Sequence, residues 1–279
     1  MASRRRRWSG RIRGADAIIT EGVLGEDFSE ITERALDAVR TWGPHLLMVV
    51  FYVGDTFGHL FGPDAEETLA AIEQIDAMTA RLLDTYAERN LLDETVITVL
   101  ADHGHMRVDE VVLADFVEQV GALPHGRLAL APGELATGEM RALLNDPRVE
   151  DVYAREELEL LGTWDTPWGE RVVALREGLM FPDARGRTMR GYHGGFTEAE
   201  WHIPLILSGP GIAAGARLDE CEIIDLAPTL SVLLGGTLPQ QNEGRVLWEI
   251  LDTPLSPAPS RATWDSGGRR TRCWQDGRT

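Results

Sequence analysis

The feature that most constrains the fold of this chain is a set of three short apolar runs, separated by segments of helical periodicity. The runs are Leu46 to Val53 (LLMVVFYV), Thr95 to Ala101 (TVITVLA) and Ile203 to Ser208 (IPLILS). Unbroken apolar runs of this length are typical of strands covered on both faces, as in parallel sheets. The alternation of such runs with helices predicts an α/β fold with a largely parallel sheet flanked by helices.

Apolar residues at steps of three and four mark the segments between these runs as helices. The first predicted helix extends from Phe28 to Trp42. The second begins near Pro63, because proline is favoured in the first turn of a helix, and continues to about Asn90. A third extends from Ile223 to Leu234 and is followed by a glycine pair that would end it.

The two ends of the chain differ in composition from its body. Residues 1–14 contain six arginines and no acid, and residues 254–279 are rich in proline, serine, glycine and arginine. Such segments cannot bury an apolar core, so we expect a disordered basic arm at 1–14 and a disordered tail at 254–279. Residues 15–253 would form one α/β domain. Its less regular part, about 107–190, is interpreted as an excursion inserted into that domain.

The charge of the chain excludes several classes of protein. All 27 basic residues are arginine, and the formal net charge is -18. Without lysine the chain cannot be a Schiff-base enzyme, a pyridoxal-phosphate enzyme or a P-loop NTPase. The excess of acids repels nucleic-acid phosphates, so we expect no nucleic-acid partner.

The cysteine content and the lack of long apolar segments bear on the cellular compartment of the protein. The chain has two cysteines, too few for a disulfide framework or a thiolate metal site. It has no apolar run long enough for a transmembrane helix, and the arginines at its start are not followed by the apolar stretch of an export signal. As written, the sequence predicts a cytoplasmic chain without a membrane partner.

Acids and histidines gather next to each apolar run. Asp55 and His59 follow the first run, Asp102 and His103 follow the second, and His193 shortly precedes the third. Ligands of parallel α/β sheets bind at the carboxyl ends of the strands. Aspartate oxygen and histidine nitrogen are the ligand types of zinc and similar divalent cations. The three clusters together therefore predict a site for two metal ions.

Other interpretations exist for the single residues. One acid or histidine after a strand usually caps a loop, and only the three clusters together, with glycines beside the imidazoles, favour metal ligands. We interpret His105 as a loop residue. His45, His125 and His202 are interpreted as structural histidines.

Four blocks of the sequence resemble a known family when taken in order. They are YVGDTFGHLFGPDAEETLAAIEQIDAMTARLLD, TVITVLADHGHM, GYHGGFTEAEWHIPLILSGPGI and IIDLAPTLSVLLG. Together they resemble the type I phosphodiesterase and nucleotide pyrophosphatase branch of the alkaline phosphatase superfamily, over about residues 16–251. The resemblance implies an alkaline-phosphatase-like fold.

The same resemblance implies roles for the five residues of the metal clusters. Asp55, His59 and His193 would bind one metal, and Asp102 and His103 would bind the second. Members of the family usually hold two zinc ions, which bind a phosphate ester and activate a threonine or serine nucleophile. Two such cations can stabilise both the attacking and the leaving oxygen of the displacement, and they would attract an anionic substrate to an acidic protein.

The sequence departs from the family pattern at its beginning. The family has a further aspartate in an apolar-Asp-Gly block, followed by the nucleophile, and neither is recognisable here. Asp16 lacks the following glycine, and Thr20 is too close to Asp16 to match the expected nucleophile. We therefore expect a domain that is incomplete at its N-terminus, with the nucleophile in the missing part and no catalytic residue assigned in this chain. Relatives of this kind are often exported, and an export signal would also lie there.

The sequence thus predicts a metal-dependent hydrolase of phosphodiester or pyrophosphate bonds in a small phosphate ester, impaired or inactive as this chain. The alternative is a non-catalytic, metal-binding remnant of such an enzyme. Phosphomutase or sulfatase chemistry on the same fold is a less favoured third interpretation. The identity of the substrate and the oligomeric state are not predicted.

Overall fold

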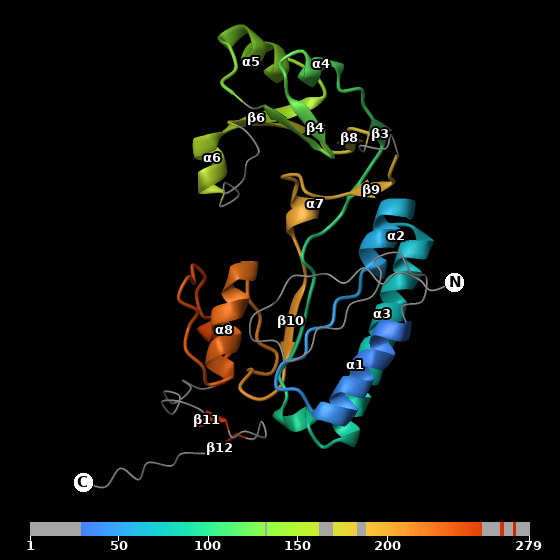
Figure 1. The fold of residues 1–279 in the computed structure, drawn as a ribbon, viewed down its shortest axis with the longest axis vertical. Coiled ribbons are helices and arrows are strands. Elements are labelled where there is room, and N and C mark those ends of the chain that lie inside the picture. The colour runs from blue at the N-terminus through green and yellow to red at the C-terminus, as the bar shows by residue number, and fades with distance from the viewer. Residues whose placement is uncertain are drawn as a thin grey trace, which may run out of the picture. The chain divides into compact units, whose positions relative to one another are not determined.

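The computed structural model describes residues 29–131, 133–161, 170–182, 188–252, 263–264 and 270–271 (Figure 1). The chain divides into two compact units, one of Met1–Leu91 and Val99–Leu205, the other of Leu92–Thr98 and Ile206–Thr279. The chain crosses between the units within β1 (Ile97–Leu100) and β10 (Leu205–Ser208), which form a two-stranded sheet. The predicted arm at 1–14 lies outside the described residues, as does most of the predicted tail.

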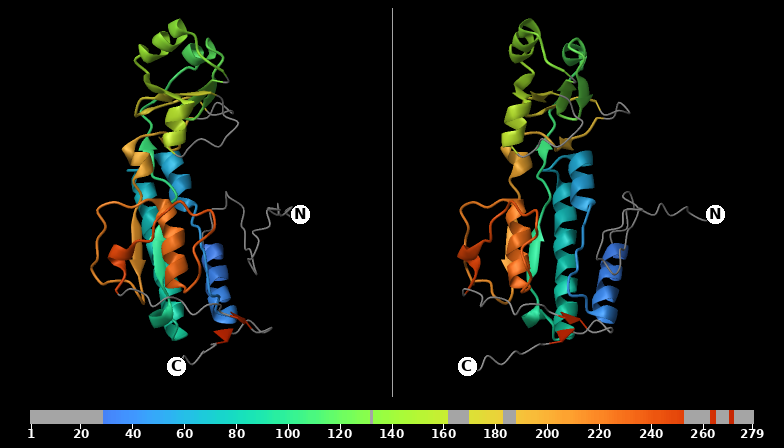
Figure 2. Two further views of the ribbon diagram at one scale, coloured as in Figure 1. Left: turned by 90° about the vertical axis from the view of Figure 1, so that its left-hand side faces the viewer. Right: turned by 60° about the vertical axis from the view of Figure 1, so that its left-hand side comes forward.

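Three helices begin the first unit, and the views in Figure 2 show α1 and α2 beside α3. They are α1 (Ser29–Trp42), α2 (Val53–Phe61) and α3 (Glu66–Glu88). Two acids, Glu66 and Glu67, lie in the first turn of α3, where they favour the positive end of the helix dipole. The helices predicted at 28–42 and 63–90 are thereby confirmed.

The apolar run predicted as the first strand is not a strand. Residues 46–52 lie in neither a helix nor a strand, and α2 begins at Val53. The side chains alternate, with Leu46 73% exposed, Met48 83% exposed, and Val50 and Tyr52 also exposed. The residues between them, Leu47, Val49 and Phe51, are half-buried. Within the described residues no strand pairs with this segment, so its backbone gains no ladder hydrogen bonds and the prediction was wrong here.

A four-stranded antiparallel sheet forms the centre of the predicted excursion. The strand order is β4-β5-β7-β6. The strands are β4 (Leu123–His125), β5 (Leu128–Ala131), β6 (Val149–Ala154) and β7 (Arg171–Leu175). The associated helices are α4 (Asp115–Glu118), α5 (Thr137–Leu144) and α6 (Arg155–Leu160). All neighbouring strands of this sheet are antiparallel, unlike the parallel arrangement that the sequence predicts for the main sheet.

The largest apolar core of the described residues lies between this sheet and the helices α4 and α5. Val173 on the central strand β7 and Phe181 are fully buried there. Phe116 and Val117 of α4 and Leu143 of α5 complete the contact. Each large apolar side chain buried in this way stabilises the fold by about 1.5 to 3 kcal/mol, so the excursion has a core of its own.

Two short strand pairs close the base of the excursion. The antiparallel pair is β2 (Met106–Arg107) with β9 (Gly191–Tyr192), and the parallel pair is β3 (Glu110–Val111) with β8 (Leu179–Met180). Met106, Val108 and Met180 form a small core beside them. The chain therefore enters and leaves this part of the unit at neighbouring strands.

The second unit contains the predicted helix at 223–234. The structure divides it into a 3-10 turn, η2 (Ile223–Asp225), and α8 (Leu226–Leu233). The buried carboxylate of Asp225 accepts hydrogen bonds from the backbone N–H groups of Glu222 and Arg245. The remaining elements are η1 (Leu92–Glu94), η3 (Trp248–Ile250), β11 (Thr263–Trp264) and β12 (Arg270–Thr271). Among the described residues, no helix combines the length and the apolar character needed to cross a lipid bilayer.

Candidate metal centre

Helix α2 supplies the first two groups of the site. Asp55 and His59 are four residues apart, so both side chains lie on the same face of the helix. Gly58, between them in the sequence, is buried against the imidazole of His105, and a Cβ at this position would lie 2.9 Å from that ring. The glycine thus lets a third group approach α2 closely.

The pairing of β2 with β9 supplies the next two groups. In the register of this pair Met106 lies opposite Tyr192. His105 precedes the first of these residues and His193 follows the second, so the antiparallel register places the two histidines on neighbouring positions. The ring centroids of His105 and His193 are 5.2 Å apart.

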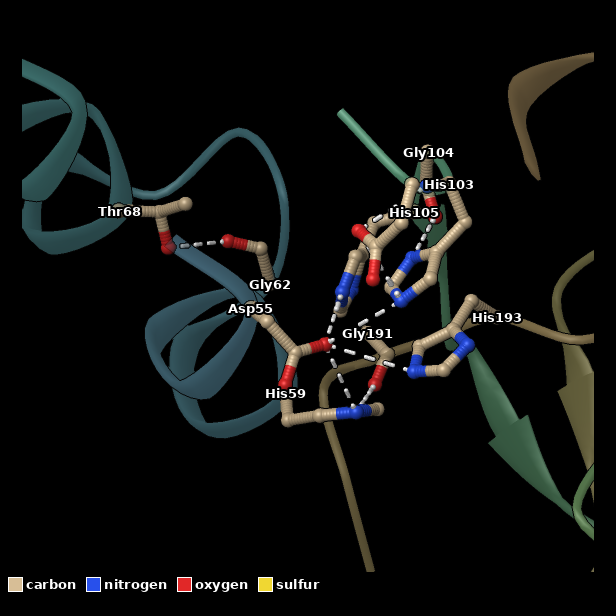
Figure 3. Close-up of polar contacts among 10 residues, drawn as sticks. Asp55, His59, Gly62, Thr68, His103, Gly104, His105, Gly191 and His193 are labelled. Carbon is tan, nitrogen blue, oxygen red and sulfur yellow. Dashed lines mark hydrogen bonds and ion pairs between the residues drawn. The ribbon is translucent and has the colours of Figure 1, made fainter. Parts of the chain in front are cut away.

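These four side chains meet at one carboxylate oxygen, Oδ1 of Asp55 (Figure 3). This oxygen lies 3.0 Å from Nε2 of His105. It lies 3.4 Å from Nε2 of His59 and 3.4 Å from Nε2 of His193. One possible ligand atom from each of the four residues lies within 4.8 Å of the other three.

The spacing of these atoms fits a divalent cation. A tetrahedral zinc site with bonds of about 2.0 to 2.2 Å has edges of about 3.3 to 3.6 Å between its ligand atoms. The separations of 3.0, 3.4 and 3.4 Å from Oδ1 of Asp55 are close to such edges. Nδ1 of His105 is buried and has no hydrogen-bond partner among the described residues. This nitrogen lies against Gly58, so a cation among these groups would instead be bound through Oδ1 of Asp55 and the Nε2 atoms that face it.

The imidazole of His59 is held in an orientation suited to a ligand. Its Nδ1 lies 2.9 Å from the carbonyl oxygen of Gly191, so the proton is assigned to Nδ1 and Nε2 is left free toward Asp55. Partial burial lowers the pKa of His59 below its usual value, against the opposing influence of the Gly191 carbonyl and Asp55. The ring is therefore neutral, as metal binding requires, over a wider pH range than an exposed histidine.

The carboxyl group of Asp55 is held in its ionised form. Partial burial raises its pKa, but hydrogen bonds from His105 and His193 and the charge of His59 lower it more, so the net pKa lies well below the usual range. Asp55 is thus an anionic oxygen donor among imidazoles at every pH where the protein is expected to be folded.

The residues predicted to hold the second metal lie beside this cluster. Nε2 of His103 lies 3.9 Å from Oδ1 of Asp55, and its ring stacks on that of His193 with centroids 3.6 Å apart. Nε2 of His103 also lies 3.8 Å from Oδ1 of Asp102, whose side chain is 83% exposed. The structure thus brings all five predicted residues into one region, and their roles as ligands stay predictions.

The sequence interpretation placed His105 in a loop, where it lies, and the structure in addition brings it into the cluster. The available signal was its spacing from His103. Residues two apart in an extended segment point to the same side, so a ligand at one position suggests a ligand at the other. The predicted structural histidines do not join the cluster: His202, for example, is 77% exposed and lies 3.2 Å from Glu198.

Comparisons with known proteins identify the same family as the sequence resemblance. The family model for type I phosphodiesterase/nucleotide pyrophosphatase matches residues 5–184. Ectonucleotide pyrophosphatase/phosphodiesterase family member 7 of Rattus norvegicus is 27% identical over 85% of this chain and 60% of its own. The Homo sapiens protein of the same name is 30% identical over 89% of this chain and 60% of its own.

Solved structures show the same fold. Murine ectonucleotide pyrophosphatase/phosphodiesterase 5 has a TM-score of 0.70 and 18% identity, over 84% of this chain and 66% of that protein. An inactive variant of the murine protein, in complex with AMP, gives the same values. These likenesses confirm the predicted α/β fold. The chain spans about 60% of the length of the curated relatives named above.

Proposed function

Because the chain belongs to the type I phosphodiesterase/nucleotide pyrophosphatase family, we propose that it hydrolyses phosphodiester or pyrophosphate bonds of small phosphate esters with the help of bound metal ions. The observation that supports this proposal is the convergence of three imidazole nitrogens on Oδ1 of Asp55. The family is metal-dependent, and this cluster is the group of donors from which a metal site can be built.

The first metal, which we take to be zinc, would be held by Asp55, His59 and His193, with His105 as a further donor or as a hydrogen-bond partner of Asp55. When bound, a divalent cation polarises a phosphoryl oxygen and stabilises the charge that develops during displacement. The carboxylate of Asp55 supplies the negative charge of the site. The carbonyl of Gly191 fixes the orientation of His59, so that its Nε2 points toward Asp55.

The second metal would be held by Asp102 and His103, together with groups that lie outside the described residues. The separation of 3.8 Å between Oδ1 of Asp102 and Nε2 of His103 permits both to face a common ion. The exposure of Asp102 leaves this side of the cluster open to solvent, where a phosphate ester could enter.

A nucleotide-like ester is the substrate class that the comparisons favour, since the inactive variant of the murine protein was solved with AMP. The catalytic nucleophile of this proposal is a threonine or serine outside the described residues.

Phosphate esters fit an acidic protein of net charge -18 only if cations in the site neutralise the local charge. The prediction of a cytoplasmic location remains untested.

The test is metal analysis of the purified, zinc-loaded chain combined with turnover of bis(p-nitrophenyl) phosphate. About two zinc ions per chain with measurable turnover would support hydrolysis by this chain and would contradict the expectation that it is impaired. His193→Ala should lower zinc content and abolish turnover, whereas the control His45→Ala, at an exposed residue outside the cluster, should change neither.

The other outcomes separate the competing interpretations. Zinc bound without turnover would favour a non-catalytic metal-binding protein. Faster turnover of p-nitrophenyl sulfate than of the phosphodiester would favour a sulfatase. Absence of bound zinc, or equal zinc loss in the two histidine variants, would overturn the proposed site.

A further inference from the structure

A buried ion pair lies next to the metal cluster, outside the residues assigned to it. Arg127 lies in the turn between β4 and β5, and Glu200 belongs to α7 (Glu198–Trp201). Nη1 of Arg127 donates to Oε2 of Glu200, and both side chains are 1% exposed. Burial of two charges carries a desolvation cost that their attraction often fails to repay, so a pair of this kind needs a reason beyond stability.

Every oxygen of the Glu200 carboxylate is used to hold the loop that follows His193. Oε1 accepts a hydrogen bond of 2.9 Å from the backbone N–H of Gly195. Oε2 accepts one of 2.6 Å from the hydroxyl of Thr197 and one of 3.2 Å from its backbone N–H. The loop that begins at His193 is therefore fixed two and four residues after the imidazole.

The backbone of Glu200 holds the second histidine loop. Its carbonyl oxygen accepts a hydrogen bond of 2.8 Å from the N–H of Gly104, which separates His103 from His105. A Cβ at Gly104 would overlap the carbonyl of Ala199, so only glycine permits this contact. One residue thus ties together both loops that bring histidines to Asp55.

Arg127 fixes this junction to the excursion. Its Nη2 donates to the carbonyl of Leu175 at 2.9 Å and its Nε to that of Leu179 at 3.3 Å. Leu175 ends the central strand β7, which lies in the best-packed sheet of the unit. Through Arg127, Glu200 is therefore held in place relative to β7.

A helix cap alone does not account for these contacts. Thr197 and Glu200 form a capping box at the start of α7, in which the glutamate needs no cationic partner and is usually exposed. Here Glu200 is buried, and its partner Arg127 is 73 residues distant in the sequence. Gly195 is also so close to the guanidinium that a side chain there would overlap it.

We propose that Glu200, held by Arg127, is a positioning residue that sets the loops of His193 and His103–His105 at the spacing needed to bind the metal. The inference rests on the proposed function, because it assumes a metal at this cluster. Residues that orient metal ligands through hydrogen bonds typically change metal affinity by about 10- to 100-fold when they are replaced.

The test replaces both charges with apolar groups of similar size, as Arg127→Met/Glu200→Met. Such a replacement can preserve the stability of a protein while it removes the acceptors of Gly195 and Thr197. The matched control is Arg176→Met/Glu150→Met, which removes an exposed ion pair of the same sheet. Zinc dissociation constants are measured by competition with a chelating dye, and the absorption spectrum of the cobalt-loaded protein reports the ligand geometry.

The expected result is a rise of the zinc dissociation constant by about 10- to 100-fold and an altered cobalt spectrum in the buried-pair variant, with an unfolding midpoint like that of the control. An unchanged zinc dissociation constant and an unchanged spectrum in a folded variant would show that the pair is merely structural. If the double variant does not fold, Glu200→Gln decides the question. It keeps the shape but weakens the charge-assisted hydrogen bonds, so zinc binding should weaken by about threefold or more, and an unchanged affinity overturns the proposal.

Hydrogen exchange separates this inference from the proposed function. In the metal-free protein, the amides of Gly195 and Thr197 should exchange about tenfold faster in the buried-pair variant, while those of β7 keep their rates. Unchanged exchange at both amides would refute the positioning role, whether or not zinc binds. Absence of zinc in the wild-type protein would refute the proposed function and the link to metal binding, while faster exchange at these amides would still show that Glu200 holds the loop after His193.

Discussion

Nε2 of His105 lies 3.0 Å from Oδ1 of Asp55, closer than the 3.4 Å that separates this oxygen from Nε2 of His59 and of His193. The two residues are 50 positions apart and meet because Gly58 leaves room for the imidazole against α2. His105 therefore belongs to the same cluster as the residues that the sequence resemblance assigns to the first metal.

The contact between His105 and Asp55 predicts a loss of metal affinity when the imidazole is removed. In His105→Ala the carboxylate of Asp55 loses the group nearest to it, so the zinc dissociation constant should rise by about tenfold or more. Competition with a chelating dye measures this constant. His202→Ala, at an exposed histidine of the same unit, serves as the control and should leave it unchanged. If His105→Ala and His202→Ala bind zinc with equal affinity, His105 is a loop residue without a part in metal binding.

The two aspartates of the site should differ in what their removal does to stoichiometry. Asp55→Asn removes the anionic centre of the histidine cluster, so the first zinc should be lost and little metal should remain. Asp102→Asn changes an exposed carboxylate beside the cluster, so the chain should keep about one zinc ion. Elemental analysis after dialysis measures both. If both variants lose the same amount, the division into two sites is incorrect.

A pH-dependent contribution to stability is expected at Asp146, in the excursion. Nε and Nη2 of Arg148 donate to its carboxylate at 2.9 and 2.8 Å, and these hydrogen bonds lower the pKa of Asp146 against a smaller effect of burial. Because the pKa is lower in the folded state, the stabilisation is fully present above the usual aspartate range and is lost as pH falls through the folded-state pKa. Asp146→Asn should therefore reduce the free energy of unfolding by about 1 kcal/mol at pH 7.

Urea titrations at several pH values test this expectation. The difference between Asp146→Asn and wild type should shrink steadily below about pH 4, where the Asp146 carboxyl of the unfolded chain begins to take up its proton. The exposed residue Asp84 provides the control, since Asp84→Asn should alter stability by no more than about 0.5 kcal/mol. A difference that is independent of pH would mean that the charge of Asp146 has no part in the effect.

The turn between β4 and β5 gives a test of the contact between the excursion and the site. Gly126 has a φ of +61°, and a Cβ there would overlap the ring of Tyr192, the residue before His193. Gly121 has a φ of +71°, with open space around its missing Cβ. In both alanine variants, backbone strain should lower the free energy of unfolding by about 1 to 2 kcal/mol. Only Gly126→Ala should also weaken zinc binding. Equal zinc affinity in the two variants would argue against this contact as a determinant of the site.

The helices were predictable from the sequence because their signals are local. Proline near the first turn, acids at the helix start and an apolar stripe fixed α3 to within a few residues of its observed bounds. The strand predicted at 46–53 failed for the opposite reason. Its apolar residues favour a covered strand, but a strand is defined by a partner, and within the described residues this segment has none.

Part of the site could also be predicted. The residue types and the glycines beside them indicated Asp55, His59 and His193, which the structure brings together. The inclusion of His105 depends on the register of β2 with β9, which the sequence does not show, and the spacing of two residues from His103 was the available local signal. The same holds for Glu200, whose capping motif is readable but whose partner Arg127 is not.

The junction at Glu200 has a consequence for the order in which the protein folds. The excursion lies between His105 and His193, so the histidines converge only after a long loop has closed. Arg127 reaches Glu200 from the turn between β4 and β5, which suggests that the sheet of the excursion forms first and the metal ligands assemble last. Zinc should then leave the folding rate unchanged and slow unfolding. A metal site that assembles after the transition state stabilises the native state without stabilising the transition state. Stopped-flow measurements of both rates, with and without zinc, would reveal this asymmetry.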